Sequence, residues 1–131
     1  MLSKKEILEV QDIQKVEVPV PEWGGVVYVK AMTGVERESW ESSLYPGGKK
    51  DLRHIREKLL VRTLVDETGE RIFGDKDVDA LSQKNGIILN RLFEKAQEIN
   101  GLRNEDVEER AKNSNSAESE GSITSSPASS E

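Results

Sequence analysis

The feature that most constrains the fold is an amphipathic repeat between Gln83 and Asn100. At 100° per residue, its apolar side chains fall within an arc of about 140°, and polar side chains fill the opposite side. Asn100-Gly101 then acts as a stop signal, because glycine readily takes the positive φ of a helix C′ position. The pattern predicts a helix with one face on a core, and that face consists of Ile88, Leu89, Leu92, Phe93, Ala96 and Ile99.

A second pattern, near the N-terminus, has the period of a β-strand. Valines at 16, 18 and 20 alternate with polar residues and with Pro19. Proline has no N–H for a ladder, so this strand is expected at a sheet edge. The turn residues Pro21 to Gly25 and a second apolar run at 26–30 follow. Residues 15–30 therefore predict a two-stranded β-hairpin.

Two capping boxes predict helix starts. Ser3 with Glu6 predicts a short helix through Glu9, and Thr33 with Glu36 predicts one through about residue 44. Tyr45-Pro46-Gly47-Gly48 is expected to end the second helix.

The middle of the chain is more ambiguous. We expect Asp51 to cap a helix that continues to Val65 and is buried in its second half, whereas a buried strand at 59–65 is the alternative. A short extended segment is expected at 71–73, and Asp75 is a candidate cap for a brief helix through Leu81.

The domain organisation follows from how charge and apolar residues are distributed. Residues 1–103 carry 17 Lys+Arg and 18 Asp+Glu, whereas residues 104–131 carry 2 and 7. Eight of the nineteen residues from Asn113 to Glu131 are serine. Such a segment offers little apolar surface to bury, so it is predicted to be disordered and dispensable for folding. We predict one mostly helical α+β domain at 1–103, with an N-terminal hairpin and an acidic, serine-rich tail.

Catalytic and ligand-binding motifs are weak in this chain. There is no cysteine, and the single histidine, His54, has no metal-ligand partner at HxxxH or HExxH spacing, so we interpret it as solvated. Asp75, Asp77 and Asp79 are explained by helix starts better than by a calcium loop, because Gly86 occupies the position of the bidentate glutamate. The sequence predicts a protein that is not an enzyme and holds no cofactor or metal.

The charge and hydropathy of the chain indicate whether nucleic acid or a membrane is an expected partner. The cluster of Lys49, Lys50, Arg53 and Arg56 is diluted by Asp51 and Glu57, and the body is nearly neutral, so a nucleic-acid partner is not expected. No apolar run approaches the roughly 20 residues that span a bilayer, and no apolar signal core follows the N-terminus. We therefore expect a soluble protein that is not exported.

Four residues are candidates for a partner surface. Trp23 lies in a hairpin turn, where tryptophan often marks a contact surface, although it can also fold over the hairpin as a lid. Ile87 lies in the polar arc of the last helix. We add Tyr28 and Arg91 to this predicted surface, and we expect that it also supports self-association.

Several ordered segments resemble one protein family. They are VPVPEWGGVVYVK at 18–30, MTGVER at 32–37, VDETGERIF at 65–73 and INGL at 99–102. In their order and spacing, over roughly residues 5–110, they are similar to the tail assembly chaperones of long-tailed, siphovirus-type bacteriophages and prophages. The serine-rich tail lies outside the resemblance.

The resemblance implies a function without catalysis, in the host bacterial cytoplasm and not in the mature virion. Chaperones of this family coat the tape measure protein, a long and largely helical chain that would aggregate, and a longer frameshifted form recruits tail tube subunits. The alternatives are another phage tail or head–tail connector component and, third, a small enzyme. Ala111-Lys112-Asn113 can be encoded as GCA-AAA-AAC, which contains the slippery heptamer A-AAA-AAC, so we place the −1 frameshift there.

Overall fold

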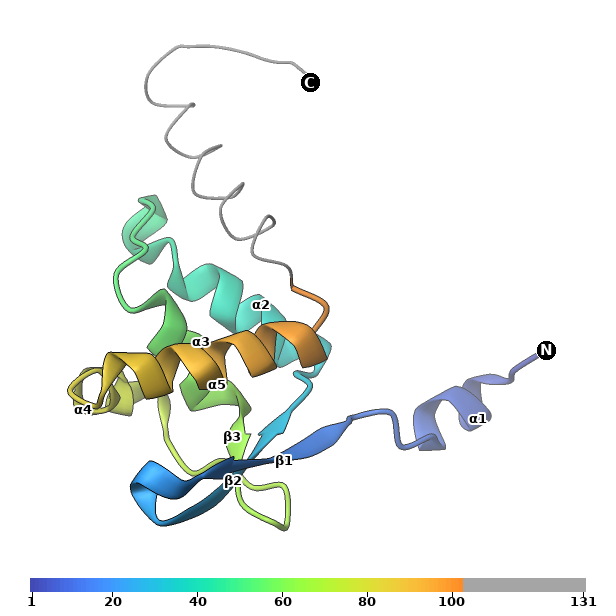
Figure 1. Cartoon of the computed structure of the whole chain (residues 1–131). Coiled ribbons are helices and arrows are strands. Elements are labelled where there is room, and N and C mark those ends of the chain that lie inside the picture. Colours follow the sequence, from blue (N-terminus) through green and yellow to red (C-terminus); the bar gives the residue numbers. More distant parts are fainter. Residues whose placement is uncertain (103–131) are drawn as a thin grey trace, which may run out of the picture.

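The computed structural model describes residues 1–102 and confirms the predicted α+β class. Helices dominate, and helices α3 and α5 lie over one face of a small antiparallel sheet (Figure 1). The predicted disordered tail at 104–131 lies outside the described residues. In chain order the elements are α1 (Lys4–Glu9), β1 (Lys15–Val20), β2 (Gly25–Lys30), α2 (Gly34–Ser43), α3 (Ile55–Thr63), β3 (Leu64–Val65), α4 (Val78–Leu81) and α5 (Gly86–Ile99), with short 3-10 turns at Pro21–Trp23, Pro46–Gly48 and Asp75–Asp77.

The predicted hairpin is present and is extended by a third strand. β1 pairs antiparallel with β2 from Lys15↔Lys30 to Val20↔Gly25, and β3 pairs with the other side of β2. β1 is therefore an edge strand, as Pro19 indicated. Gly24, at φ +81°, closes the hairpin turn by donating its N–H to the Pro21 carbonyl at 3.0 Å.

Both predicted capping boxes form. The Glu6 N–H donates to Ser3 Oγ at 3.2 Å while the Ser3 N–H donates to Glu6 Oε1 at 2.8 Å. Thr33 and Glu36 make the same reciprocal pair at 3.2 and 2.9 Å. Since each pair satisfies two backbone donors at a helix start, these boxes set where α1 and α2 begin.

The prediction for residues 51–65 was partly wrong. The helix, α3, ends at Thr63, and Leu64–Val65 form strand β3 against Tyr28 and Val29. The strand alternative was thus correct only for the last two residues. The apolar residues between 59 and 65 would wrap most of the circumference of a helix, so periodicity alone could not separate a buried helix from a buried strand.

The predicted caps at two helices were also wrong. The Asp51 carboxylate accepts hydrogen bonds from the Arg53 backbone and guanidinium, and His54 stands at the N-cap of α3 without a side-chain cap bond. Asp75 pairs with Arg71, while Asp77 accepts the Gly74 N–H at 2.7 Å before α4. In both places the predicted capping carboxylate instead forms hydrogen bonds with a nearby arginine, Arg53 for Asp51 and Arg71 for Asp75.

The hydrophobic core lies between the sheet and the helices. β2 packs against α5, Val18 and Val20 of β1 join the same core, and α3 packs against α2, α4 and α5. α3 is the central buried helix, as predicted. The predicted apolar face of α5 is confirmed, with five of its six residues buried and Ile99 partly buried against the core. The largest side chains without exposed surface are Trp40, Leu59, Leu60, Leu64 and Leu92.

Asn100 joins the end of α5 to the end of β2. Its Oδ1 accepts the Met32 N–H at 2.7 Å, and its Nδ2 donates to the carbonyl oxygens of Lys30 and Ala96 at 3.3 and 2.9 Å. Arg37 Nη1 donates to the Asn100 carbonyl at 3.2 Å. The helix stop predicted at Asn100-Gly101 is confirmed, because Gly101 takes φ +68°.

We expect Asn100→Ala to destabilise the domain by about 2 kcal/mol, because half-buried backbone groups of Met32 and Lys30 lose their partner. Urea denaturation followed by far-UV circular dichroism measures this change. Asn90→Ala is the matched control on the same helix, since Asn90 makes exposed side-chain contacts only. Equal effects of the two substitutions would contradict the assigned role of Asn100.

Candidate functional site

The candidate site is the place where the hairpin turn meets α5. Arg91 donates from Nη1 to Glu22 Oε1 at 3.0 Å and from Nη2 to Glu22 Oε2 at 2.5 Å. Paired parallel hydrogen bonds of this kind fix orientation as well as distance. The Glu22–Arg91 pair therefore holds the 3-10 turn at Pro21–Trp23 against the exposed side of α5, although the two residues are 69 positions apart in sequence.

Each member of this ion pair has an exposed apolar residue close to it along the chain. Trp23 follows Glu22 directly and is 36% exposed, whereas Ile87 is one helical turn before Arg91 and is 76% exposed. Since residues i and i+4 share a helix face, Ile87 and Arg91 point to the same side of α5. We call Glu22, Trp23, Ile87 and Arg91 the turn–helix surface.

Tyr28 lies elsewhere. It is opposite Glu17 in the β1–β2 register, and its hydroxyl donates to Glu17 Oε1 at 3.4 Å. Lys15 Nζ stands 4.9 Å from the centroid of its ring. Alternation along β2 puts the buried Val29 toward the helices and its neighbour Tyr28 on the other face of the sheet. Of the four predicted partner residues, the structure brings together Trp23, Ile87 and Arg91 and separates Tyr28 from them.

The Glu22–Arg91 pair sets the ionisation of Glu22. The side-chain hydrogen bond from Arg91 and, after it, a bond from the Glu22 backbone N–H lower the pKa of Glu22 from 4.5 to about 2. A carboxylate with a depressed pKa contributes stability that is present above its unfolded pKa and is lost as pH falls through the folded value. The contact between the turn and α5 should therefore weaken between about pH 4.5 and pH 2.

We expect the Glu22 side-chain carboxyl to titrate near pH 2 in a carbon-detected NMR pH titration. Arg91→Ala should return this midpoint toward the ordinary glutamate value, because the dominant hydrogen bond is removed. Lys95→Ala on the same helix is the control, since Lys95 pairs with Glu98 at 3.0 Å and not with Glu22. An unchanged midpoint in Arg91→Ala would show that another group lowers the pKa of Glu22.

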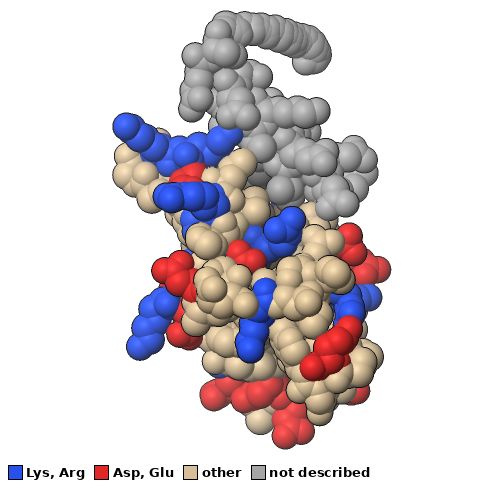
Figure 2. Space-filling model, turned by 60° about the vertical axis from the view of Figure 1, so that its left-hand side comes forward, with Lys and Arg blue, Asp and Glu red and all other residues tan. Residues whose placement is uncertain are grey.

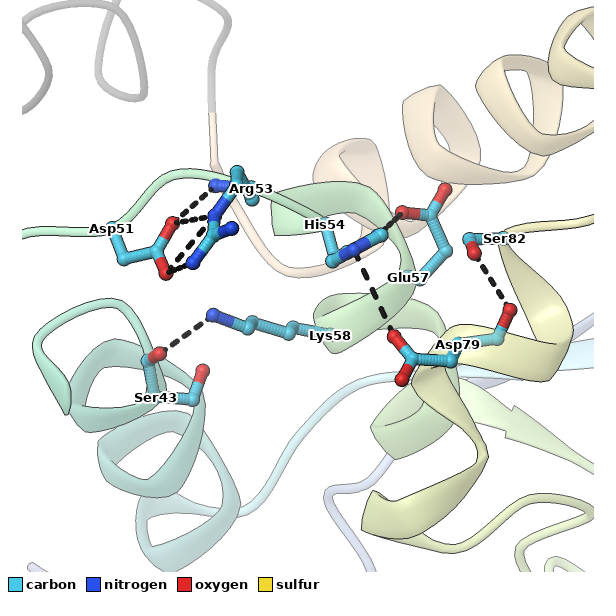
Figure 3. Close-up of polar contacts among 8 residues, drawn as sticks. All are labelled: Ser43, Asp51, Arg53, His54, Glu57, Lys58, Asp79 and Ser82. Atoms are coloured by element: carbon cyan, nitrogen blue, oxygen red, sulfur yellow. Dashed lines mark hydrogen bonds and ion pairs between the residues drawn. The ribbon is translucent and has the colours of Figure 1, made fainter.

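The surroundings of His54 do not form a nucleophile–base pair. Its Nδ1 lies 3.5 Å from Glu57 Oε1 and its Nε2 lies 3.8 Å from Asp79 Oδ1 (Figure 3). The hydroxyl of Ser82 donates to the Asp79 backbone carbonyl at 2.6 Å. The His54 side chain is 41% exposed, in line with the predicted solvated histidine, and the residue stands at the N-cap of α3 with φ +62°.

Both arginines of the candidate basic cluster have partners within the chain. Arg53 makes a 2.8 Å ion pair with Asp51, and Arg56 donates to Asn90 Oδ1 at 3.2 Å and lies 6.0 Å from the ring of Phe93. In the view of Figure 2, basic side chains gather at the upper left and acidic side chains at the lower end, with both signs mixed in between. Nucleic-acid binding needs a continuous positive stripe, and the visible face does not present one.

Residues 1–102 contain neither a metal-binding group nor a membrane-spanning helix. Among these residues, no three His, Asp or Glu side chains are grouped closely enough to hold a metal ion. In the same range, no helix has the length and apolar character to cross a bilayer.

One exposed feature was missed by the sequence analysis. Every residue from Met1 to Lys15 is exposed, and α1 buries no side chain. Figure 1 shows α1 projecting away from the body. We call residues 1–14 the N-terminal arm. Its sequence shows a capped helix, but a local pattern does not reveal whether that helix packs on the domain.

Comparison with known proteins shows which family this chain belongs to. A family model described as "Phage tail assembly chaperone" matches residues 4–113, which is most of the chain. The chain belongs to the phage tail assembly chaperone family. The resemblance predicted from the sequence, over roughly residues 5–110, is thus confirmed.

A solved member supports the fold of this tail assembly chaperone. The structure of the bacteriophage HK97 tail assembly chaperone aligns with a TM-score of 0.55 at 17% sequence identity, covering 76% of this chain and 95% of that one. Among curated proteins, none matches this chain. The family match begins at residue 4, so residues 4–14 of the N-terminal arm lie inside the family region.

Proposed function

We propose that this chaperone binds the phage tape measure protein and keeps it soluble before the tail is built. Membership of the tail assembly chaperone family is the observation that carries the proposal. The role is one of binding without catalysis, in the host cytoplasm, and the chaperone leaves before the virion is complete.

The turn–helix surface is the proposed contact for this client. A long apolar helix aggregates through its apolar stripe, and a binding partner must cover that stripe. Trp23 and Ile87 offer two exposed apolar anchors, which suit side chains spaced by one or two turns of an amphipathic helix. The exposed Glu22–Arg91 pair between them can also meet polar groups along the edge of that helix.

We also propose that a longer, frameshifted form recruits tail tube subunits. The family match ends at residue 113, the last codon of the proposed slippery site at 111–113. A frameshift there would leave the matched region common to both products and change only the segment after it. The nucleotide sequence tests this directly: codons 111–113 should contain A-AAA-AAC or a close variant, followed by a long open frame in the −1 register.

Co-expression with the tape measure protein tests the main proposal. The gene for that protein is expected beside the chaperone gene, with the tail tube gene on the other side. We expect the tape measure protein to be insoluble alone, soluble with the chaperone and insoluble with an unrelated acidic protein of similar size. An equally insoluble tape measure protein in both co-expressions would refute the proposal. Detection of the chain in purified virions would favour a tail or connector component instead.

A further inference from the structure

The C-terminal end of α5 borders a hollow that the function proposed above does not use. Its volume is about 230 Å³, and it is lined by Glu94, Gln97, Glu98 and Leu102. Pockets for cofactors and similar small molecules usually measure about 300–1,000 Å³, so a ligand of the size of one amino-acid side chain fits this space better. We call it the α5 hollow, and Figure 1 shows this end of α5 beside the last described residues.

Gln97 is a buried polar residue whose side-chain amine lacks a partner. The residue is 4% exposed, and its Nε2 makes no hydrogen bond within residues 1–102. Leaving a buried donor unsatisfied costs stability, so such groups are uncommon in folded proteins. The terminal torsion of a glutamine is soft, so the amide can turn its N–H groups toward the α5 hollow that the residue lines. An acceptor in the hollow therefore gives Gln97 the partner that it lacks.

The two glutamates of the lining favour a positively charged ligand. Glu94 and Glu98 stand four residues apart, so both lie on one side of α5. Glu98 lies in the last turn, where the negative end of the helix dipole adds to its field. Asn90 donates to Glu94 at 3.4 Å and Lys95 to Glu98 at 3.0 Å. An ionised carboxylate has about four acceptor sites, so both glutamates can accept from a further donor.

An arginine residue within a polypeptide meets all of these requirements. Its guanidinium donates to carboxylates in paired hydrogen bonds. Its aliphatic stem packs on an apolar side chain, which Leu102 supplies. Its backbone carbonyl accepts from an amide donor such as Gln97 Nε2. A metal ion fits less well, because it would leave that donor without an acceptor.

We propose that the α5 hollow binds an arginine residue of a partner polypeptide, with the guanidinium on Glu94 and Glu98 and a backbone carbonyl on Gln97. The tail of the same chain is a poor occupant. Residues 104–131 carry 2 Lys+Arg and 7 Asp+Glu, and this net negative charge is repelled by two glutamates.

The α5 hollow is separate from the turn–helix surface but lies along the same helix. Glu94 and Glu98 are 7 and 11 residues after Ile87, which places them on the same side of α5. At 1.5 Å per residue, Glu98 is about 16 Å from Ile87 along the helix axis. The hollow is thus a second contact point on this side of α5, and the inference does not depend on the identity of the client.

A small probe tests the α5 hollow on the full chain. N-acetyl-arginine methylamide carries the guanidinium and two backbone carbonyls, and N-acetyl-citrulline methylamide is its neutral counterpart. Two-dimensional ¹H–¹⁵N NMR follows the side-chain amide of Gln97 and the backbone amides of 94–102 during titration. We expect saturable shifts there, with a dissociation constant of about 1–10 mM for the arginine probe, the range of a ligand of this size. The citrulline probe should bind about tenfold more weakly, since it lacks the charge.

Substitution of the two glutamates tests the charge requirement. Glu94→Gln with Glu98→Gln should weaken binding of the arginine probe by about tenfold, because the charge-assisted hydrogen bonds are lost. Glu9→Gln with Glu38→Gln is the matched control with the same change in net charge, since both residues are exposed and lie outside the α5 hollow. The control pair should leave the affinity unchanged.

Substitution of Gln97 separates binding from a purely structural role. Gln97→Met keeps an unbranched side chain of similar length and removes the amide donor. It should weaken binding of the arginine probe by about fivefold, the loss of one neutral hydrogen bond. It should also raise the urea midpoint of the free chain, because the unsatisfied buried donor is gone. A glutamine that only supported the fold would give a lower midpoint instead.

Several outcomes overturn the proposal. They are shifts that do not saturate with the arginine probe, equal binding of the citrulline probe, equal effects of the two glutamate pairs and a lower urea midpoint in Gln97→Met. Arg103→Gln with Arg110→Gln should leave probe affinity unchanged. Tighter binding by that variant would show that an arginine of the same chain already fills the α5 hollow, which overturns the assignment to a partner. The client solubility assay does not use the probe, so the proposed function stands or fails separately.

Discussion

Replacing Trp40 by alanine is expected to lower the free energy of unfolding by about 3–5 kcal/mol, enough to unfold much of a marginally stable domain. Trp40 lies on α2 and has no exposed surface. Its indole Nε1 donates to the Ile55 carbonyl at 3.4 Å at the start of α3. The substitution removes the largest side chain of the core and leaves a cavity between two helices, and that carbonyl loses one of its donors.

Urea denaturation followed by far-UV circular dichroism measures the loss. Val35→Ala, on the same helix, is the control and should change stability by less than about 0.5 kcal/mol, because Val35 is 76% exposed. The loss of unfolding free energy in Trp40→Phe should lie between those of Trp40→Ala and Val35→Ala, since phenylalanine keeps most of the packing and lacks the indole N–H. If Trp40→Ala and Val35→Ala were equally mild, the core would not be centred on α2 and α3.

The parts of the fold predicted best are those with a local signal. The hairpin combines a period of two with turn residues, and α5 combines a period of 3.6 with a glycine stop. The capping boxes at Ser3 and Thr33 are also local, because all their partners lie within three residues. In the hairpin, in α5 and at the two capping boxes, tertiary packing favours the same local structure as the sequence pattern, so the prediction matches the structure.

The parts predicted less well depend on partners distant in sequence. Thr63 ends α3 because Leu64 and Val65 pair with β2, and nothing within the apolar run marks that change. Asp51 and Asp75 are plausible caps by type, but arginines hold their carboxylates. A choice between two local partners of similar energy is decided by the surrounding structure, which the sequence pattern does not contain.

The same distinction holds for the candidate site. Exposure of Ile87 was predicted from its position in the polar arc of a periodic helix, and exposure of Trp23 from its place in a turn. Their association was not predicted, because it depends on the Glu22–Arg91 pair between distant segments. Tyr28 was grouped with them from sequence, whereas the register of β2 directs it to the other face of the sheet.

Changes on the turn–helix surface are expected to have the largest effect on client binding. Trp23→Ala and Ile87→Ser should each weaken binding of the tape measure protein by roughly 30-fold, the effect of an interface hot spot of about 2 kcal/mol. Both residues are exposed, so thermal stability should change little. Affinity for a soluble tape measure fragment, measured by isothermal titration calorimetry, gives the first quantity and a thermal melt gives the second.

Ile72→Ser is the matched control for Ile87→Ser, because Ile72 is 47% exposed in the segment after β3 and lies outside the turn–helix surface. It should leave client affinity within about twofold of the unchanged chain, since surface contacts outside the hot spot contribute little. Tyr28→Phe adds a second comparison on the other face of the sheet. If Trp23→Ala and Ile87→Ser bind the fragment as well as Ile72→Ser does, the proposed client contacts another surface of this chain. If Ile87→Ser weakens binding and Trp23→Ala does not, the indole is a lid over the hairpin and α5 alone makes the contact.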